Sequence, residues 1–204
     1  MQKVYLTGIY IVLFIMSFFG TSYASWLFYN KPEYKGKIID SETKEPIEGA
    51  VVVAIYYTHP IISGPAGGSS SIIHFKEVLT DNNGNFLLPS YKTFIQPNSK
   101  EDRTEIIIFK PGYGSYPRGQ ISPPTNVDSE HFFTEKFGSK GQIGRGTKAI
   151  KFIFGLVELP KFKTPGERLK NLPGFPSEMS SKDSPIFYKL LNEERKRLGL
   201  GEVK

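Results

Sequence analysis

The amino-acid sequence predicts an all-β protein, an antiparallel β-sandwich that is followed by a C-terminal helical tail. Between Tyr34 and Val157 the apolar residues form short runs of strand length, rich in β-branched and aromatic side chains. Gly, Pro, Asn and Asp bound these runs, and such residues favour turns between strands. After Leu159 the pattern changes to capping residues and helical spacing, which indicates helices.

The first 24 residues have the pattern of a secretory signal peptide and are set aside from the fold. Lys3 precedes the apolar run Val4–Phe19, and the small residues Ser22 and Ala24 stand where cleavage is expected. We therefore expect an exported protein, periplasmic or secreted, that begins at Ser25. The alternative is an uncleaved N-terminal membrane anchor, although the run is shorter than the roughly 20 apolar residues of a spanning helix.

The composition limits how the exported part is stabilised. The chain has no cysteine, which excludes disulfides, a thiolate nucleophile and a zinc–thiolate site. A hydrophobic core must hold the fold, and residues 25–204 suffice for one domain with such a core. We expect the sandwich over residues 34–159 and the helical tail over 160–204. The formal net charge of +6 mainly bears on solubility.

Two of the apolar runs, Val51–Ile55 and Ile106–Phe109, are apolar at every position. Strands buried on both faces have this composition, so we expect these two runs in the middle of the sheets. The predicted strands are Tyr34–Asp40, Ala50–Tyr57, Ile72–Thr80, Asn85–Leu88, Thr104–Lys110 and Lys148–Val157.

Three turn motifs occur in order along the sandwich. The first is the hairpin Gly36–Val53, which reads GKIIDSETKEPIEGAVVV, and the second is Thr80–Phe86, which reads TDNNGNF. The third is Phe109–Tyr113, in which a Pro-Gly-Tyr turn ends an apolar run. Asn, Asp and Gly tolerate the positive φ angles that such tight turns require.

These three motifs resemble the carboxypeptidase-regulatory-like domain family, also called transthyretin-like or prealbumin-like. The resemblance covers Tyr34 to Tyr113 and implies an immunoglobulin-like, transthyretin-like β-sandwich. It also implies a non-catalytic accessory role and no cofactor or metal. The motif residues assigned to folding rather than to function are Asp40, Thr43, Pro46, Gly49, Asp81 and Gly84.

The chain departs from this family in the long Gly- and Pro-containing insertion at residues 114–146. Loops of this length are uncommon unless they are functional or disordered, and disordered segments are usually poor in aromatic residues. Aromatic faces with a few polar groups suit sugar rings or extended peptides. The loop His59–Ser71 is a second candidate surface. The candidate binding residues in and beside the insertion are Tyr113, Tyr116, His131, Phe132 and Phe133.

Two helices are predicted in the tail. Thr164-Pro165-Gly166-Glu167 is a capping-box pattern, so a short helix should run to Leu172. A longer helix should begin at Ser184 and end at Gly199, with one apolar face. We expect this face to pack against the sandwich; the alternative is a contact with a partner or a membrane surface.

The chain offers few residues for nucleophilic or metal catalysis. Its histidines are His59, His74 and His131, and no Gly-x-Ser-x-Gly elbow surrounds the serines at 69–71. The resemblance extends in shape to intradiol dioxygenases, which use two Tyr and two His with the histidines close together in sequence. This chain lacks such a close pair. No metal site is therefore predicted.

The function that we expect is an exported, non-catalytic module that acts as a binding or structural accessory of the cell envelope. Its partner would be an envelope protein, a peptide or a polysaccharide, and not nucleic acid. A membrane would be a partner only if the N-terminal segment stays uncleaved. The alternative is a hydrolase or metal-dependent enzyme with a pocket under the 114–146 insertion, where His131 would act with Asp128 or Glu130. Two histidines, or His131 and a serine, within hydrogen-bond reach would favour this alternative.

Overall fold

The computed structural model describes residues 28–62, 67–116 and 155–204. The expected signal peptide and most of the 114–146 insertion, with His131, Phe132 and Phe133, lie outside these residues. The described elements are β1 (Phe28–Lys31), β2 (Tyr34–Asp40), β3 (Val51–Pro60), β4 (Ser71–Leu79), β5 (Asn85–Leu88), β6 (Tyr91–Phe94), β7 (Ser99–Phe109), β8 (Gly155–Leu159), α2 (Pro165–Lys170) and α3 (Pro185–Arg197).

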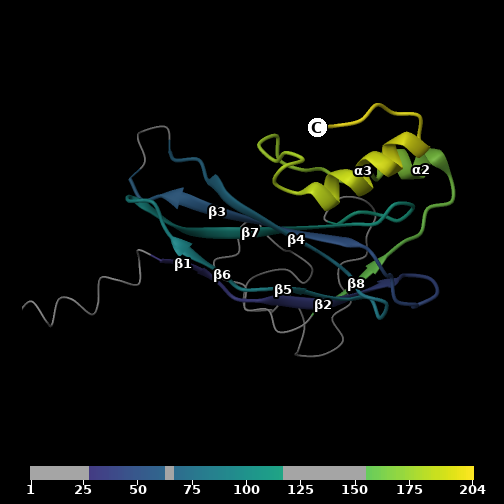
Figure 1. Cartoon of the computed structure of the whole chain (residues 1–204), viewed down its shortest axis with the longest axis horizontal. Helices are drawn as coiled ribbons and strands as arrows, with labels where there is room; N and C mark the ends of the chain where they lie inside the picture. The colour runs from purple at the N-terminus through teal and green to yellow at the C-terminus, as the bar shows by residue number, and fades with distance from the viewer. Residues whose placement is uncertain (1–27, 63–66, 117–154) are drawn as a thin grey trace, which may run out of the picture.

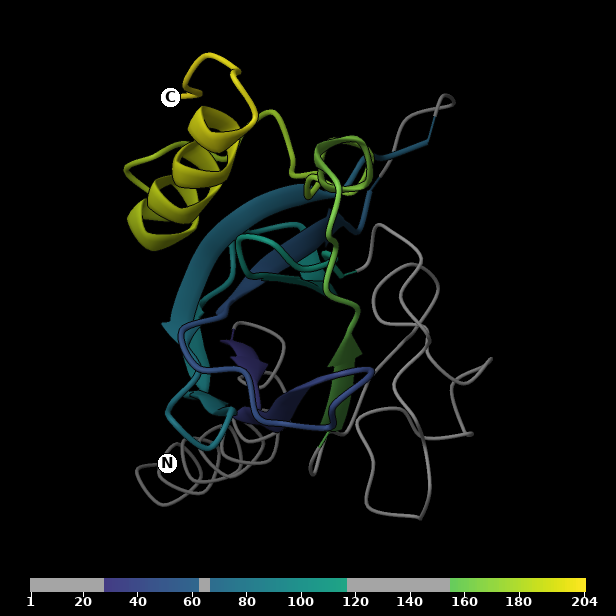
Figure 2. The ribbon, with the colours of Figure 1, turned by 90° about the vertical axis from the view of Figure 1, so that its right-hand side faces the viewer.

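The strands form two packed layers, with the helices on the outside of one layer (Figures 1 and 2). One layer is the sheet β4-β3-β7, and the other contains the sheet β5-β2-β8 and the ribbon β1-β6. This arrangement confirms the predicted all-β sandwich with a C-terminal helical tail. One pair departs from the antiparallel prediction, because β2 and β8 run parallel.

Strands β1 and β6 were not predicted, and two prolines explain why. Pro32 and Pro89 lack the backbone N–H that a sheet ladder needs, so they interrupt the pairing of β2 with β5. The ladder resumes beyond them in the same register, from Lys31 opposite Tyr91 to Phe28 opposite Phe94. The sandwich therefore begins at Phe28, before the expected start at Tyr34. Only the later part of the strand predicted at Lys148–Val157 lies within the described residues, as β8.

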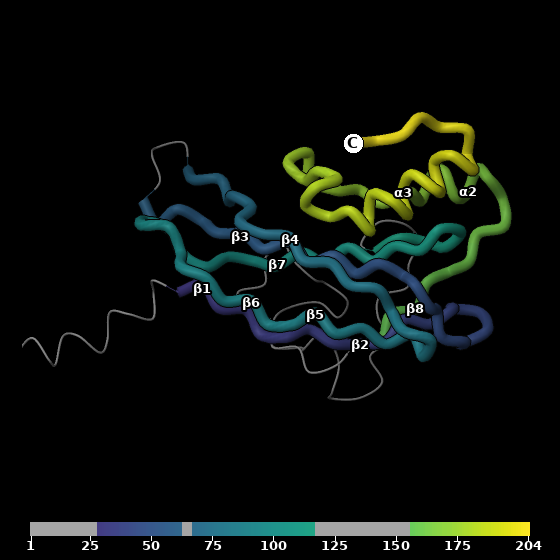
Figure 3. The backbone as a smooth tube through the Cα atoms, in the orientation of Figure 1, coloured from purple at the N-terminus to yellow at the C-terminus, as the bar shows by residue number. Residues whose placement is uncertain are grey.

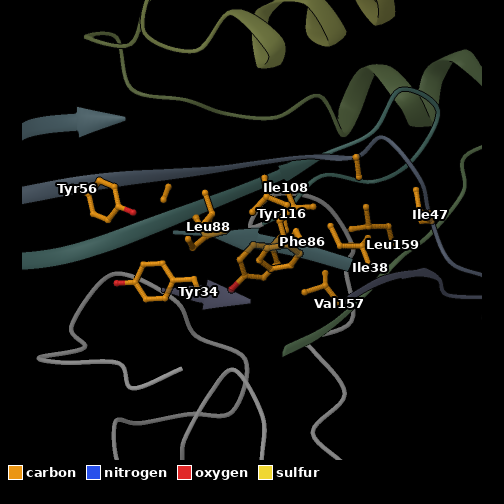
Figure 4. Packing of buried hydrophobic residues seen from close by; sticks show 14 of the residues in the cluster. Tyr34, Ile38, Ile47, Tyr56, Phe86, Leu88, Ile108, Tyr116, Val157 and Leu159 are labelled. Atoms are coloured by element: carbon orange, nitrogen blue, oxygen red, sulfur yellow. The ribbon is translucent and has the colours of Figure 1, made fainter. Parts of the chain in front are cut away.

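The main core fills the space between the two layers (Figure 4). Alternate residues of the central strand β3, namely Val52, Ala54 and Tyr56, point into it. Ile38 and Leu88 face them from the opposite layer, and all five side chains are fully buried. Each buried aliphatic side chain of this kind contributes about 1.5–3 kcal/mol to stability.

A second core lies between the outer face of the β4-β3-β7 sheet and helix α3. The remaining alternate residues of β3 and β7 pack here against α3, as predicted for the apolar face of this helix. Among the described residues β7 pairs with β3 on one side, and on its other side Ile108 exchanges backbone hydrogen bonds with Tyr116. The residues that follow Tyr116 lie outside the described part of the chain, so the place of Ile106–Phe109 in the middle of a sheet stays a prediction. The run is apolar at every position because Ile107 and Phe109 face the helix layer. The main members of this second core are Val51, Val53, Ile55, Ile107, Phe109, Phe187, Tyr188 and Leu191.

The first two turn motifs form turns that contact each other. The Asp40 carboxylate accepts hydrogen bonds from the backbone N–H groups of Glu42 and Thr43, at 2.8 and 3.1 Å. The Asp81 carboxylate in the second turn likewise accepts from the N–H groups of Asn83 and Asn85, at 2.9 and 2.8 Å. Each aspartate therefore accepts hydrogen bonds from backbone N–H groups of its own turn that the strands do not pair.

The two turns touch at Gly84. Its backbone has φ +74°, and a Cβ built on it would lie 2.4 Å from the carbonyl oxygen of Ile38. The Gly84 carbonyl accepts a hydrogen bond from the Ile38 N–H at 2.8 Å. Thr80 adds a second link, since its hydroxyl donates to Ile47 and accepts from the Ala50 N–H, at 2.7 and 2.8 Å. These contacts support the folding role assigned to the motif residues.

Both predicted helices are confirmed. Thr164 and Glu167 form the expected capping box at the start of α2. At the start of α3 the Ser184 side chain makes no capping bond; instead Glu77 of β4 accepts from the N–H groups of Ile186 and Phe187, at 2.7 and 2.9 Å. None of the helices in the described part of the chain has the length and apolarity that crossing a membrane requires.

Substitution Gly84→Ala tests the contact between the two turns. We expect it to lower the free energy of unfolding by about 3 kcal/mol, because left-handed strain of about 1–2 kcal/mol adds to the clash with Ile38. Gly67→Ala is the matched control, since Gly67 also has a positive φ but open space around its Cβ position. Urea unfolding measures both; equal losses would contradict the role of Gly84.

Substitution Glu77→Ala tests the attachment of α3 to the sheet. We expect a loss of about 2 kcal/mol, because hydrogen bonds to a charged acceptor contribute about 1.5–3 kcal/mol. Glu48→Ala removes an exposed carboxylate and should change stability by less than about 0.5 kcal/mol. Denaturation followed by circular dichroism compares them. A Glu77→Ala variant as stable as Glu48→Ala would show that this cap does not hold the helix.

Candidate functional site

The described aromatic residues of the predicted binding surface belong to the scaffold. Tyr116 is 5% exposed, packs in the main core and pairs through its backbone with Ile108. Tyr113 is partly buried; burial, and then the negative charge of Asp40, raise its pKa. The structure therefore buries Tyr116 in the sandwich and leaves Tyr113 partly exposed. His131, Phe132 and Phe133 lie outside the described residues.

A hollow of about 460 Å³ is lined by residues of strand β4 and of the chain that leads into α3. Figure 3 shows the course of these two parts of the backbone. Among the described residues, β4 pairs with a strand on one side only, so the hollow follows a sheet edge. The opposite wall is held in shape by Asp183, whose carboxylate accepts from the N–H and hydroxyl of Ser180, at 3.0 and 2.5 Å. The lining residues are Ile72, Ile73, His74, Phe75, Glu178, Lys182 and Asp183.

Beside the hollow is a group of polar side chains, which we call the Asp102 cluster. Its position follows from the sheet register, because Tyr57 pairs with Ile72 of the hollow. The Arg103 guanidinium lies over the Tyr57 ring, with its carbon 4.2 Å from the ring centroid. Arg103 Nε and the Tyr57 hydroxyl both donate to Glu105, at 2.8 and 3.0 Å. The members of the Asp102 cluster are Tyr57, His59, Ser70, Asp102, Arg103 and Glu105.

Asp102 organises the other half of this cluster. Its carboxylate accepts hydrogen bonds from the Ser70 hydroxyl at 2.6 Å and from Arg103 at 3.1 Å. Burial alone would raise the pKa of Asp102. The hydrogen bonds and the positive charge of Arg103 lower it by more than burial raises it, so the pKa lies below its ordinary value. Burial, and then Glu105, raise the pKa of Tyr57. At neutral pH Asp102 is therefore an anion and Tyr57 a hydrogen-bond donor.

The cluster brings a histidine and a serine together, but not in the order of a catalytic triad. His59 Nδ1 lies 3.3 Å from the Ser70 hydroxyl oxygen. In a triad the histidine takes the serine proton and the aspartate orients the histidine. Here the Ser70 hydroxyl donates its hydrogen bond to Asp102 and accepts one from Arg103 at 3.2 Å, so His59 does not take the serine proton as the base of a triad would. The contact with His59 thus belongs to a network that holds the loop ends.

The other described histidine has a different environment. His74 stacks on Tyr91 with ring centroids 4.3 Å apart, and burial lowers its pKa. In the part of the chain that the structure describes, no three His, Cys, Asp or Glu side chains are grouped so as to hold a metal ion. The enzyme alternative with His131, Asp128 and Glu130 concerns residues outside that part.

Sequence reasoning singled out the loop His59–Ser71, and the structure does bring its two ends together at His59 and Ser70. It missed the contributions of β7. The sheet register shifts opposite Tyr57, so that two successive residues, Asp102 and Arg103, reach the same cluster. No local signal in the sequence marks such a bulge. The residues at 178–183 were also missed, because only tertiary packing places them beside β4.

Comparison with protein-family models and with curated proteins gave no match. Among solved structures, the chain is similar to 3-chlorocatechol 1,2-dioxygenase from Rhodococcus opacus 1CP, with a TM-score of 0.30 and 16% sequence identity. The match covers 67% of this chain and 60% of that one, so the chain spans less than two thirds of that protein's length. A structural similarity with so low a TM-score supports no conclusion about function.

Substitution Asp102→Asn tests the cluster through pH. A carboxyl whose pKa is lower when folded stabilises the fold above its unfolded pKa, and this stability is lost as the pH falls through the folded value. We expect Asp102→Asn to cost about 1–2 kcal/mol at pH 7, because hydrogen bonds to a charged group are lost. The difference from the wild type should shrink below the ordinary pKa of 3.8.

The measurement is the free energy of unfolding at a series of pH values. Glu48→Gln, at an exposed carboxylate, should follow the wild-type profile. A difference between wild type and Asp102→Asn that stays constant from pH 7 to strongly acidic solution would contradict the assigned ionisation of Asp102.

Proposed function

We propose that the protein is an exported, non-catalytic β-sandwich module of the cell envelope that binds an extended segment of a partner protein. The hollow beside β4 is the observation that carries this proposal. The first two turn motifs support it as well, since their residues make hydrogen bonds of the scaffold and leave function to a surface. Resemblance to the carboxypeptidase-regulatory-like domains points to the same accessory role.

The position of the hollow favours an extended peptide as the ligand. A sheet edge can pair with a partner strand through backbone hydrogen bonds, while neighbouring pockets receive alternate side chains. Lys76 closes part of the β4 edge, because its ammonium donates to the carbonyls of Pro89 and Ser90, at 3.1 and 3.3 Å. The part of β4 that lines the hollow, Ile72–Phe75, comes before this point, and its half-buried side chains leave part of their surface to the hollow.

Charge favours a basic segment. The hollow and the adjoining Asp102 cluster contain more carboxylates than basic groups, so their field attracts positive charge. Arg103 is already engaged by two of these carboxylates, whereas Glu178 is an exposed carboxylate in the lining of the hollow. The carboxylates are Asp102, Glu105, Glu178 and Asp183, and the basic groups are Arg103 and Lys182.

Charge reversal at Glu178 tests the proposal. The chain with an affinity tag is used to capture partners from an envelope extract, and bound protein is quantified by mass spectrometry. We expect Glu178→Lys to weaken capture about ten-fold, which corresponds to about 1.4 kcal/mol, because an attractive charge becomes repulsive. Glu178 is exposed, so the fold should not change.

Glu193→Lys is the matched control, because it makes the same charge change at an exposed position of α3 away from the hollow. It should capture as much as the wild type. Equal capture by Glu178→Lys and Glu193→Lys, or capture of polysaccharide instead of protein, would contradict a peptide site at the hollow.

A further inference from the structure

Helix α3 begins with a residue of the right type to cap it, but the helix does not use this residue. Ser184 is the N-cap residue, and serine is among the side chains that helices prefer there. Ser184 is fully buried, and its hydroxyl has no hydrogen-bond partner among the described residues. Native structures rarely keep a buried hydroxyl without a partner, because this costs free energy. The Ser184 hydroxyl is therefore a spare capping group at the start of α3.

The backbone donors that this serine would cap are bound by another strand. Glu77 of β4 accepts from the N–H groups of Ile186 and Phe187, at 2.7 and 2.9 Å. Since the helix starts at Pro185, these two residues are its second and third. The N–H groups at these two positions are the ones that an N-cap side chain binds. Glu77 and Ser184 are thus alternative caps for the same donors.

Helix α2 shows the conformation that the spare cap would need. Its N-cap residue Thr164 has φ −102° and ψ 145°, and its hydroxyl accepts from the Glu167 N–H at 3.3 Å. Ser184 has φ −143° and ψ 68°, so the larger difference between the two residues is in ψ. Rotation of ψ at Ser184 toward the value of Thr164 would bring its hydroxyl to the Phe187 N–H.

This rotation would move one short turn of the chain. The Ser184 carbonyl accepts from the Tyr188 N–H at 3.1 Å and would stay with the helix while the preceding chain turns. Residues 180–183 form one unit, because the Asp183 carboxylate binds Ser180 and the Ser184 N–H donates to the Ser180 carbonyl at 3.2 Å. Before this turn, Met179 is buried, and its carbonyl accepts from the Tyr188 hydroxyl at 2.6 Å. The movement is therefore confined to residues 180–183.

The turn and the present cap belong to opposite walls of the hollow. Lys182 and Asp183 of the turn line it on one side, and β4, which carries Glu77, lines it on the other. While Glu77 caps α3, its two hydrogen bonds hold β4 against the start of the helix. When Ser184 supplies the cap, β4 is released from the helix and the two walls can separate.

We propose that α3 exchanges its N-terminal cap between Glu77 and Ser184, and that this exchange opens the hollow to an extended segment. The inference rests on the proposed function for the ligand and adds the conformational step that admits it. The Glu77 cap is the major state without a ligand, because hydrogen bonds to a charged acceptor are the stronger ones. A segment that binds only the open hollow shifts the population toward the Ser184 cap.

A double-mutant cycle tests the exchange without a ligand. In the wild type we expect Ser184→Ala to cause no loss of stability, because the hydroxyl makes no hydrogen bond there. In the Glu77→Ala background the same change should raise the equilibrium constant of unfolding about five-fold, because the hydroxyl then serves as the N-cap. Urea unfolding measures all four proteins.

Thr164→Ala is the matched control, because it removes an N-cap hydroxyl that is in use on α2. It should raise the equilibrium constant of unfolding by the same factor in both backgrounds, since Thr164 and Glu77 share no hydrogen-bond partner. If the variant that lacks both caps of α3 does not fold, Glu77→Gln replaces Glu77→Ala, because the amide keeps a neutral acceptor and gives a milder background.

A spin label tests the opening. The chain has no cysteine, so Lys182→Cys carries a nitroxide at a single exposed position in the lining of the hollow. In the wild type the nitroxide should broaden the amide NMR signals of Ile72–Phe75. We expect this broadening to weaken in Glu77→Ala, where Ser184 caps the helix, and to stay unchanged in Thr164→Ala.

A cost of Ser184→Ala that is the same with and without Glu77, including no cost in either, would overturn the exchange of caps. Broadening in Glu77→Ala as strong as in the wild type would overturn the opening of the hollow. Both measurements are made without a partner, so their failure is distinct from a failure of Glu178→Lys to weaken capture.

Discussion

The burial of strand β3 on both faces is the constraint on which the rest of the structure depends. Every residue from Val51 to Thr58 is buried, with alternate side chains in the main core and in the second core under α3. A two-layer sandwich alone would leave the outer set in water. The helical tail is therefore part of the domain, and Glu77 on the neighbouring strand attaches it by capping α3.

The tail also creates the candidate site. The chain that approaches α3 passes beside β4, and this approach forms the hollow at the sheet edge. The same sheet carries the Asp102 cluster, where a register shift brings Asp102 and Arg103 to one place. Scaffold and candidate site thus share the sheet β4-β3-β7, which suits a binding module with rigid walls.

The sequence predicted most of the fold because its signals are local. The bounds of β2 and β5 agree with the predicted runs, and the capping box at Thr164 starts α2 as expected. Prediction failed where a partner far along the chain decides the structure. Strands β1 and β6 are short, and they form because they continue an existing ladder past two prolines. The candidate site was predictable only at the loop ends His59 and Ser70.

The sequence by itself determined the all-β class, the order of the main strands, both tail helices and the scaffolding turns, because hydrophobic period and turn chemistry act over a few residues. Tertiary structure decided the rest. It placed β7 under a helix, buried Tyr116 in the core, and joined Glu178 to β4 across the fold. Such contacts join residues distant in the chain, and only the packing of complete layers brings them together.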